Sequence, residues 1–299
     1  MANYYISGGK TSTGITLNSG DSMHVYNATV NNATLNGGWL NVSYGGIANN
    51  TIVKYNGFMN VFYGGRANST HVYGYMNISN GAVAGNTIVY SNGYVNLFGT
   101  ASNVVVNSQG FLNVNAGGVA KNIGVYDSAG IYVNGTAYNI SLNRGGHMSI
   151  YGTANDINVN TNGSVYIASN GKANSTIIDY GDMYIDSRGL ASYTVVNSRG
   201  SMRIGGGSAV NTIINKRGFV RIFSGSMTNT SVNYGGRMDV SSGGVASDTE
   251  VNSGGVLNVK YGGSAVNIKE NGGFVDVSYL PNATFVSNTV TGVTLQGSM

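Results

Sequence analysis

The chain has 299 residues, of which 41% are hydrophobic and only 9% are charged, with a formal net charge of +4. Disordered chains combine low hydrophobicity with high net charge, so this composition predicts a folded protein in spite of its 47 glycines. The absence of cysteine excludes disulfides and thiolate metal sites. The chain has no apolar run of the roughly 18 residues that a transmembrane helix needs, so no membrane-spanning helix is expected.

Taken in chain order, residues 1–14 are predicted to form a partial coil or cap, and residues 15–279 carry an internal repeat of 17–19 residues. Each repeat follows the pattern A-x-[NDS]-[TIV]-x-V-N-x-x-G-x-Φ-x-V-x-x-G-G-x, in which Φ is apolar. Residues 280–299 lose the Gly-Gly spacing but keep apolar residues, which predicts a terminal strand or cap.

The apolar positions of the repeat alternate within Φ-x-V, and this period of two indicates β-strands, while nothing in the repeat has helical spacing. A small residue, mostly alanine, and two further positions complete the predicted inward side of each repeat. The best aligned of these columns contains Val25, Val42, Val61, Ile78, Leu97, Val114, Val133, Ile150, Ile167, Ile185, Ile204, Ile222, Val240, Val259 and Val277.

A repeat of this length has two or three short strands and cannot bury its own apolar face, whereas stacked repeats can. The pattern therefore predicts an all-β fold, a right-handed parallel β-helix (β-solenoid) of about 16 coils of 17–19 residues, forming one domain over residues 1–299. The inward positions do not fit the period of six that left-handed hexapeptide helices require, and crossovers are generally right-handed. The glycines are expected at turns that need positive φ.

Two columns of asparagine follow from this stacking, one at the start of a turn (for example Asn215 and Asn233) and one at a corner (for example Asn103 and Asn122). Identical amides in register can hydrogen-bond along the stack, and asparagine tolerates turn conformations. A structural role is therefore expected for both columns.

The stretches TEVNSGGVLNVKYGGSAVN (249–267) and TSVNYGGRMDVSSGGVASD (230–248) show T-x-V-N-x-G-G, then Φ-x-V, then G-G-x-A or its close variant. This ordered set resembles the AIDA-type repeat of self-associating autotransporter adhesins, and the resemblance covers roughly residues 6–279. It implies a secreted β-helical passenger at the bacterial cell surface that acts in adhesion, cell–cell aggregation or biofilm formation. It also implies that Ser and Thr in the repeats can be O-glycosylated.

Outward positions differ from repeat to repeat, and they are where binding is expected. In the N-terminal half one outward column is aromatic, with Phe62 and Phe98 beside it. Contiguous exposed aromatic residues often mark an interaction surface, although a cross-strand ladder that stiffens the sheet explains them equally well. The aromatic column contains Trp39, Phe58, Tyr75, Tyr94 and Phe111.

Toward the C-terminal half the same face becomes basic. Arg203 and Arg221 are neighbours in one column, Arg237 lies close to them, and Arg199 and Arg217 stack at the adjoining turn. An acidic glycan, a lipopolysaccharide or a nucleic acid could offset the repulsion between stacked arginines. The excess charge is small, however, so solvated surface arginines are the simpler interpretation and no nucleic-acid partner is expected.

Sparse acidic residues give little support for catalysis. Asp179, Asp182 and Asp186 form the one cluster, and no second carboxylate column, lysine or histidine completes a site for polysaccharide cleavage. The three histidines fall in different repeats, so no metal site is predicted, and no cofactor motif is present.

The sequence thus favours a non-enzymatic extracellular adhesin or self-association module that acts through the outer faces of its coils. Its expected partners are further copies of itself or surface glycans of a host or of bacteria. Two alternatives stay open, namely a tailspike-like β-helix that binds or cleaves polysaccharide, and a passive structural spacer.

Overall fold

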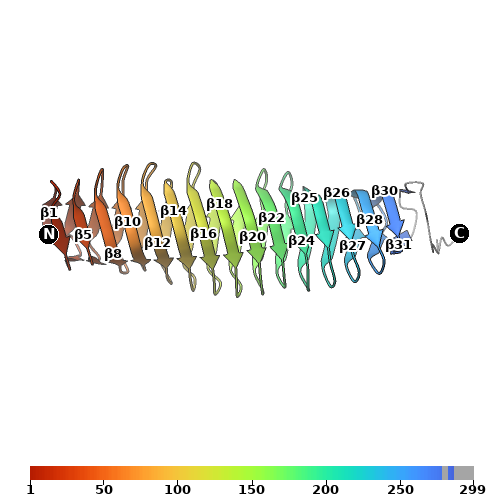
Figure 1. Cartoon of the computed structure of the whole chain (residues 1–299), viewed down its shortest axis with the longest axis horizontal. Helices are drawn as coiled ribbons and strands as arrows, with labels where there is room; N and C mark the ends of the chain where they lie inside the picture. Colours follow the sequence, from red (N-terminus) through yellow and green to blue (C-terminus); the bar gives the residue numbers. More distant parts are fainter. Residues whose placement is uncertain (278–281, 286–299) are drawn as a thin grey trace. The chain divides into compact units, whose positions relative to one another are not determined.

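The computed structural model describes residues 1–277 and 282–285, and it divides into two compact units, Met1–Met148 and Ser149–Met299. The described residues contain strands and turns but no helix (Figure 1). Each unit consists of coils stacked by parallel strand pairing, about 15 turns in all, so the predicted β-solenoid is confirmed. None of the described segments is a helix long and apolar enough to cross a membrane.

The strands of the first unit are short and follow one another in a fixed rhythm. They are β1 (Asn3–Ile6), β2 (Thr11–Thr13), β3 (Thr16–Asn18), β4 (Ser22–Val25), β5 (Thr29–Asn31), β6 (Thr34–Asn36), β7 (Trp39–Val42), β8 (Ile47–Val53), β9 (Phe58–Val61), β10 (Arg66–Val72), β11 (Tyr75–Ile78), β12 (Val83–Val89), β13 (Tyr94–Leu97), β14 (Thr100–Val106), β15 (Phe111–Val114), β16 (Val119–Val125), β17 (Gly130–Val133) and β18 (Thr136–Leu142). β19 (His147–Ile150) contains residues of both units.

The second unit continues the same rhythm, with two longer strands. Its strands are β20 (Thr153–Val159), β21 (Ser164–Ile167), β22 (Lys172–Ile178), β23 (Asp182–Ile185), β24 (Leu190–Val196), β25 (Ser201–Ile214), β26 (Phe219–Val232), β27 (Arg237–Val240), β28 (Gly244–Asn252), β29 (Val256–Val259), β30 (Ser264–Asn271), β31 (Phe274–Val277) and β32 (Asn282–Phe285).

One coil consists of a long strand that bends once and a short strand that follows a tight turn. β8 and β9 illustrate this, because β8 pairs in parallel with β10 while β9 pairs with β11. The register places Ala48 beside Ala67 and Met59 beside Met76, so each repeat position lies next to its equivalent in the following coil. We call the short strand of each coil the Φ-x-V strand.

The interior of each unit consists of the predicted inward columns. In the coil of β8 and β9, the side chains of Ala48, Thr51, Val53, Met59 and Val61 are all buried. Full burial of a Val, Leu, Ile or Met side chain contributes about 1.5–3 kcal/mol, so a few such residues per coil stabilise the stack in the absence of disulfides. Many coils have a buried threonine whose hydroxyl oxygen has no hydrogen-bond partner, among them Thr51, Thr70, Thr87, Thr176, Thr194, Thr212, Thr230 and Thr249.

A left-handed residue makes the bend in each long strand. Asn103 lies there with φ of 55°, and Asn86, Asn122 and Asn139 have similar values. The side-chain amide of Asn103 donates to Asn86 Oδ1 over 3.0 Å and that of Asn122 donates to Asn103 Oδ1 over 3.0 Å. The predicted corner column of asparagines is therefore a ladder of amides that also meets the backbone requirement.

Glycines at the turns have two different roles, of which the sequence analysis recognised one. Gly64 and Gly81 have the expected positive φ. Gly93 and Gly255, which directly precede a Φ-x-V strand, do not have a left-handed φ, and a Cβ at either position would collide with a carbonyl oxygen of the preceding coil, that of Val72 or of Val232. These glycines are required for close packing of coils rather than for a turn conformation.

A partial coil or cap is predicted at each end of the chain, and the structure describes the N-terminal one more fully than the C-terminal one. β1 and β2 pair in register with β4 and β5, so residues 3–13 already follow the coil pattern. The predicted C-terminal strand or cap, residues 280–299, lies outside the described residues except for β32, whose backbone pairs with β30.

In β30, Glu270 pairs with Val251 of the inward aliphatic column, and burial raises the pKa of the Glu270 carboxyl group.

Two substitutions at Asn103 separate the backbone contribution from the amide ladder. Asn103→Ala removes both side-chain hydrogen bonds and leaves a β-carbon in the left-handed region, so the free energy of unfolding should fall by about 2 kcal/mol. Asn103→Gly removes the same bonds without backbone strain and should cost about half as much. Urea unfolding followed by circular dichroism measures both, and equal losses would contradict a conformational role for this position.

Candidate interaction surface

The outer face of the Φ-x-V strands carries most of the predicted site residues. Three outward columns run along it in each unit. We call them the first column (Trp39 and its equivalents), the middle column (Asn41 and its equivalents) and the third column (Ser43 and its equivalents), each equivalent lying one coil further along the chain. Residues of the first and middle columns lie on β7, β9, β11, β13 and β15 in the first unit.

The register brings the five predicted aromatic residues into one continuous stack. Trp39 pairs with Phe58, Phe58 with Tyr75, Tyr75 with Tyr94, and Tyr94 with Phe111. The ring centroids of Trp39 and Phe58 are 4.3 Å apart with an interplanar angle of 11°, and those of Phe58 and Tyr75 are 5.1 Å apart at 8°. The tilted pair is Tyr75–Tyr94, at 6.3 Å and 48°.

Parallel stacking determines which parts of these rings reach solvent. Tyr94 and Phe111 are also stacked, at 5.3 Å and 9°, so most rings in the column have a neighbouring ring against a face. Trp39 is the first ring of the stack, with Phe58 on one side and Ser22 as its column neighbour on the other, and it is 42% exposed. Beyond Trp39 the stacked rings cover one another's faces and leave mainly their edges for solvent.

The aromatic column ends at Gly130, which takes the next place after Phe111. A β-carbon at Gly130 would lie 2.9 Å from the Phe111 ring and 2.6 Å from His147 Nε2, so these two side chains close over the glycine from either side. Tyr132, in the middle column, meets the edge of Phe111 at a centroid distance of 4.7 Å and an angle of 75°.

The middle column of the first unit is a third asparagine ladder, which the sequence analysis missed. The side-chain amide of Asn60 donates to Asn41 Oδ1 over 2.9 Å, Asn77 donates to Asn60 over 3.0 Å, and Asn96 donates to Asn77 over 3.0 Å. The recurring N of L-N-V and M-N-V was the available signal. The amide groups of this ladder bond to one another, so the column contributes a flat polar strip.

Two phenylalanines stand out in the third column of the first unit. Phe62 is 44% exposed and Phe98 is 46% exposed, and serines occupy the same column at Ser43 and Ser79. Among the described residues no ring–ring contact involves Phe62 or Phe98. Their rings are therefore available for contact with a partner, unlike those of the stacked column.

In the second unit the same face is charged. Arg203 pairs with Arg221 and Arg221 with Asp239 in the middle column, while Arg237 follows Phe219 in the first column. Arg199 and Arg217 lie at the turn before the Φ-x-V strand, where both have positive φ and the backbone N–H of Arg199 donates to the carbonyl of Arg217 over 3.0 Å. The five predicted arginines thus occupy two places, three on the face and two at its turn.

Asp239 organises this charged region, and sequence reasoning did not single it out. Its side chain is only 3% exposed. The guanidinium of Arg237 donates to Oδ1 over 2.9 Å and to Oδ2 over 3.1 Å, while Lys260 Nζ lies 2.7 Å from Oδ2 and Asn258 Nδ2 lies 2.7 Å from Oδ1. Burial alone would raise the pKa of Asp239, but the hydrogen bonds from Arg237, Lys260 and Asn258 outweigh burial and hold the pKa at about 2.

The geometry of the coils can be compared with known proteins. No protein-family model and no curated protein sequence matches the chain. Among solved structures, the TibC-catalyzed hyper-glycosylated TibA55-350 fragment matches with 33% identity and a TM-score of 0.76, over 92% of this chain and 99% of that chain. This chain belongs to the family of TibA. The likeness is consistent with the AIDA-type β-helix that the repeats predict.

Two further solved structures match at low similarity. The A-module of the mannuronan C-5 epimerase AlgE4 from Azotobacter vinelandii is 10% identical with a TM-score of 0.34, over 96% of this chain and 91% of that chain. The receptor-binding domain of the Siphovirus 9NA tailspike is 9% identical with a TM-score of 0.35, over 100% of this chain and 75% of that chain. At these scores neither likeness supports any statement about function.

Two of the three aspartates of the predicted cluster in this TibA-family chain, Asp182 and Asp186, make contacts with neighbouring side chains. Asp186 accepts hydrogen bonds from the Tyr166 hydroxyl and, over 2.7 Å, from the Ser187 backbone N–H. The Tyr166 hydrogen bond is the main cause of the lowered pKa of Asp186, and the same bond raises the pKa of Tyr166 to about 12. A general acid needs a raised carboxyl pKa, which Asp186 lacks, and Asp182 lies 3.8 Å from Arg203.

Two of the three histidines lie against tyrosine rings. The ring of His24 stacks on Tyr5 at 4.9 Å, and His71 lies 5.7 Å from Tyr90 in another coil. Within residues 1–277 and 282–285 no group of three or more His, Cys, Asp or Glu side chains could hold a metal ion.

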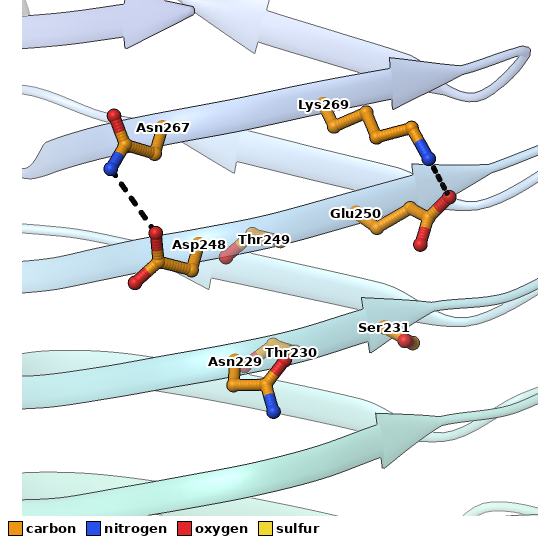
Figure 2. A pocket seen from close by; sticks show the side chains of 8 residues that line it. All are labelled: Asn229, Thr230, Ser231, Asp248, Thr249, Glu250, Asn267 and Lys269. Carbon is orange, nitrogen blue, oxygen red and sulfur yellow. Dashed lines mark hydrogen bonds and ion pairs between the residues drawn. The ribbon is translucent and has the colours of Figure 1, made fainter. Parts of the chain in front are cut away.

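A shallow groove of about 400 Å³ lies on another face of the second unit, over the later halves of β26, β28 and β30 (Figure 2). Asn267 donates to Asp248 Oδ1 over 3.1 Å, and Lys269 pairs with Glu250 at 2.8 Å. The charged groups drawn in Figure 2 are therefore largely satisfied by one another. The groove is lined by Asn229, Thr230, Ser231, Asp248, Thr249, Glu250, Asn267 and Lys269.

The lowered pKa of Asp239 predicts a specific loss of stability in acid. A carboxyl group whose pKa is lower in the folded than in the unfolded chain stabilises the fold above its unfolded pKa, near 4, and this contribution disappears as the pH falls toward about 2. The contribution of Asp239 is on the order of 2 kcal/mol. Asp239→Asn keeps the amide type found elsewhere in this column and lacks the titration. The difference in Tm between wild type and variant should therefore shrink or reverse between pH 5 and pH 2.5, whereas parallel curves would contradict the prediction.

Proposed function

We propose that this chain is an extracellular adhesin-type module of the bacterial cell surface, and that it self-associates through the outer face of the Φ-x-V strands in its first unit. The stacked aromatic column, with the exposed Phe62 and Phe98 two columns away, is the observation that carries the proposal. The likeness to the TibA fragment supports an adhesin role and a position outside the cell.

The orientation of the rings favours a protein surface as partner over a neutral sugar. Sugars stack on open aromatic faces, but Phe58 is stacked between Trp39 and Tyr75 at 4.3 and 5.1 Å. Ring edges, a flat amide ladder and isolated phenylalanines form a surface of low charge that a second apolar surface can cover. A second copy of the chain offers such a surface by two-fold symmetry.

The size of the surface predicts weak association. Five coils at roughly 4.8 Å each and a width of about 13 Å give about 300 Å² per copy, and stable interfaces bury at least ~1,200 Å² in total. A single contact of this kind is transient. Many copies displayed on one cell would bind a facing cell through the sum of such contacts, as cell–cell aggregation requires.

Replacing the two exposed phenylalanines should abolish self-association and leave the fold intact. In Phe62→Ser/Phe98→Ser each new serine matches Ser43 and Ser79 of the same column, so the coil already accommodates it. The loss of two exposed aromatic anchors is expected to weaken association at least tenfold, since such residues contribute about 1–2 kcal/mol each. Analytical ultracentrifugation over a concentration series and settling of cells that display the chain measure the effect.

The matched control is Ile52→Ser, which removes an exposed apolar side chain from a different face and introduces a residue that the same column holds at Ser141. It should associate like wild type. An unchanged association of the double variant, or a wild-type chain that stays monomeric at high concentration without aggregating cells, would favour a passive spacer instead.

We also propose that the exposed turn serines of this chain accept O-linked sugars, because the TibA relative is described as hyper-glycosylated by TibC. Accessibility separates two groups of hydroxyls. The buried threonines cannot reach an enzyme, whereas one serine per turn projects into solvent in several coils: Ser91, Ser108, Ser128, Ser187, Ser242 and Ser253.

Co-expression with TibC should therefore add sugar to the turn serines and leave Thr51 and Thr87 unmodified. Peptide mapping by mass spectrometry locates the sugars, and Ser91→Ala/Ser108→Ala should lower the intact mass by the two corresponding glycans. Modification of the buried threonine column, or an unchanged mass of the wild-type chain, would contradict this assignment.

A further inference from the structure

Among the described residues, the charged part of the Φ-x-V face in the second unit contains a cation that its neighbours do not neutralise. This cation is Arg221, in the middle column of β26. It pairs with Arg203 in the coil before and with Asp239 in the coil after. Its surroundings therefore decide whether it is a satisfied surface residue or a group held ready for a ligand.

The nearest carboxylate has no capacity left for Arg221. Asp239 Oδ1 accepts from Arg237 Nε at 2.9 Å and Asn258 at 2.7 Å, and its Oδ2 accepts from Arg237 Nη2 at 3.1 Å and Lys260 at 2.7 Å. Each oxygen already has two donors, which fills its lone pairs. Asp239 thus fixes Arg237 and Lys260 at the edge of the region and leaves the next arginine unpaired.

The Arg221 guanidinium is held in place without a polar partner. Its Cζ lies 4.6 Å from the centroid of the Phe223 ring, and its buried Nε makes no hydrogen bond. No ion pair of Arg221 occurs among the described residues, while Arg203 reaches Asp182 only at 3.8 Å between two exposed side chains. The buried Nε is thus an unsatisfied donor, and no carboxylate in the part of the chain that the structure describes pairs with the guanidinium.

The charge around Arg221 favours an anion. Arg203 and Arg221 are neighbours in the middle column, and the carboxylates beside them are the exposed Asp182, 3.8 Å from Arg203, and Asp239, whose oxygens are taken by Arg237 and Lys260. A further carboxylate of this column, Asp276, lies two coils beyond Asp239. Asp186, one coil before Arg203, is hydrogen-bonded by Tyr166 of the preceding coil. A local positive excess therefore stays on the strip that the middle column of β25 and β26 forms, where Arg203 and Arg221 are repeated at one-coil spacing, roughly 4.8 Å, comparable to one pyranose unit along an extended chain.

We propose that this strip binds a carboxylated polysaccharide, with the planar guanidinium of Arg221 taking a sugar carboxylate and with Arg203 and the Arg237–Lys260 edge taking neighbouring acidic groups. The planar fork of donors in arginine matches the two oxygens of a carboxylate. A single-stranded nucleic acid fits less well, because its bases need open aromatic faces, and Phe223 and Phe219 lie under the guanidinium groups of Arg221 and Arg237. The proposal does not depend on the aromatic column, so its failure would leave the proposed self-association untouched.

Titration calorimetry of the full chain with a galacturonate hexamer tests the site. Arg221→Asn introduces the residue that this column holds at Asn60, Asn77 and Asn258, so the coil should fold as before. The expected result is binding by wild type and a loss of at least about tenfold in Arg221→Asn. Arg217→Asn removes an equal charge at the turn, where asparagine suits the positive φ of 64°, and should bind within about twofold of wild type.

Three further probes make the assignment specific. A neutral glucose hexamer should not bind, and polyphosphate and a single-stranded DNA of similar length should bind more weakly than galacturonate. An equal loss in both arginine variants would show diffuse attraction to net charge and overturn the proposal. Tighter binding of DNA or polyphosphate, or no binding of galacturonate by wild type, would overturn it as well.

Discussion

The structure depends on one constraint, the parallel in-register pairing of each coil with the next. Because equivalent residues lie directly beside one another, a side chain chosen once per repeat becomes a column along the unit, as Ala48 and Ala67 or Val53 and Val72 do in the core. The same constraint explains the glycines that precede the Φ-x-V strands. Coils can approach to pairing distance only where no β-carbon meets the carbonyl oxygens of the coil before, as at Gly93 and Gly255. Core, corner and turn are therefore consequences of a single packing distance.

Columns favour some residue types and penalise others, and this shapes the outer face. Amides and flat rings gain from identical neighbours, which is why Asn60 bonds to Asn41 and Phe58 stacks on Trp39. Identical cations one coil apart repel each other, so a column of cations requires a nearby negative charge. Asp239 provides that charge and forms ion pairs with Arg237 of the same strand and with Lys260 of a later coil. Arg221 forms no ion pair with Asp239, whose oxygens already accept hydrogen bonds from other donors, so the proposed external anion is what would neutralise Arg221.

Periodicity in the sequence predicts most of this architecture, because aligning the repeats shows which residues are equivalent and therefore which residues form each column. The inward residues, the corner asparagines and the membership of the aromatic column all follow from counting. Interactions that depend on side-chain conformation do not. Nothing in the spacing indicates that Arg237 bends along its own strand to Asp239, or that Tyr166 reaches Asp186 across a coil. The packing role of Gly93 was likewise hidden, because a glycine required for space and a glycine required for positive φ look the same in sequence.

The two units carry different chemistry on the same face, and this difference has a consequence for assembly. Two copies of the first unit can bring Phe62 and Phe98 together at little electrostatic cost, because their surroundings are amides, serines and ring edges. Two copies of the charged strip cannot, because Arg203 and Arg221 of one would face those of the other with no spare carboxylate between them. The proposed self-association would thereby be confined to the aromatic face, and the arginine strip would stay open to the proposed partner of opposite charge. A single repeat can thus support two kinds of contact, since only the outward residues change from coil to coil while the inward columns stay the same.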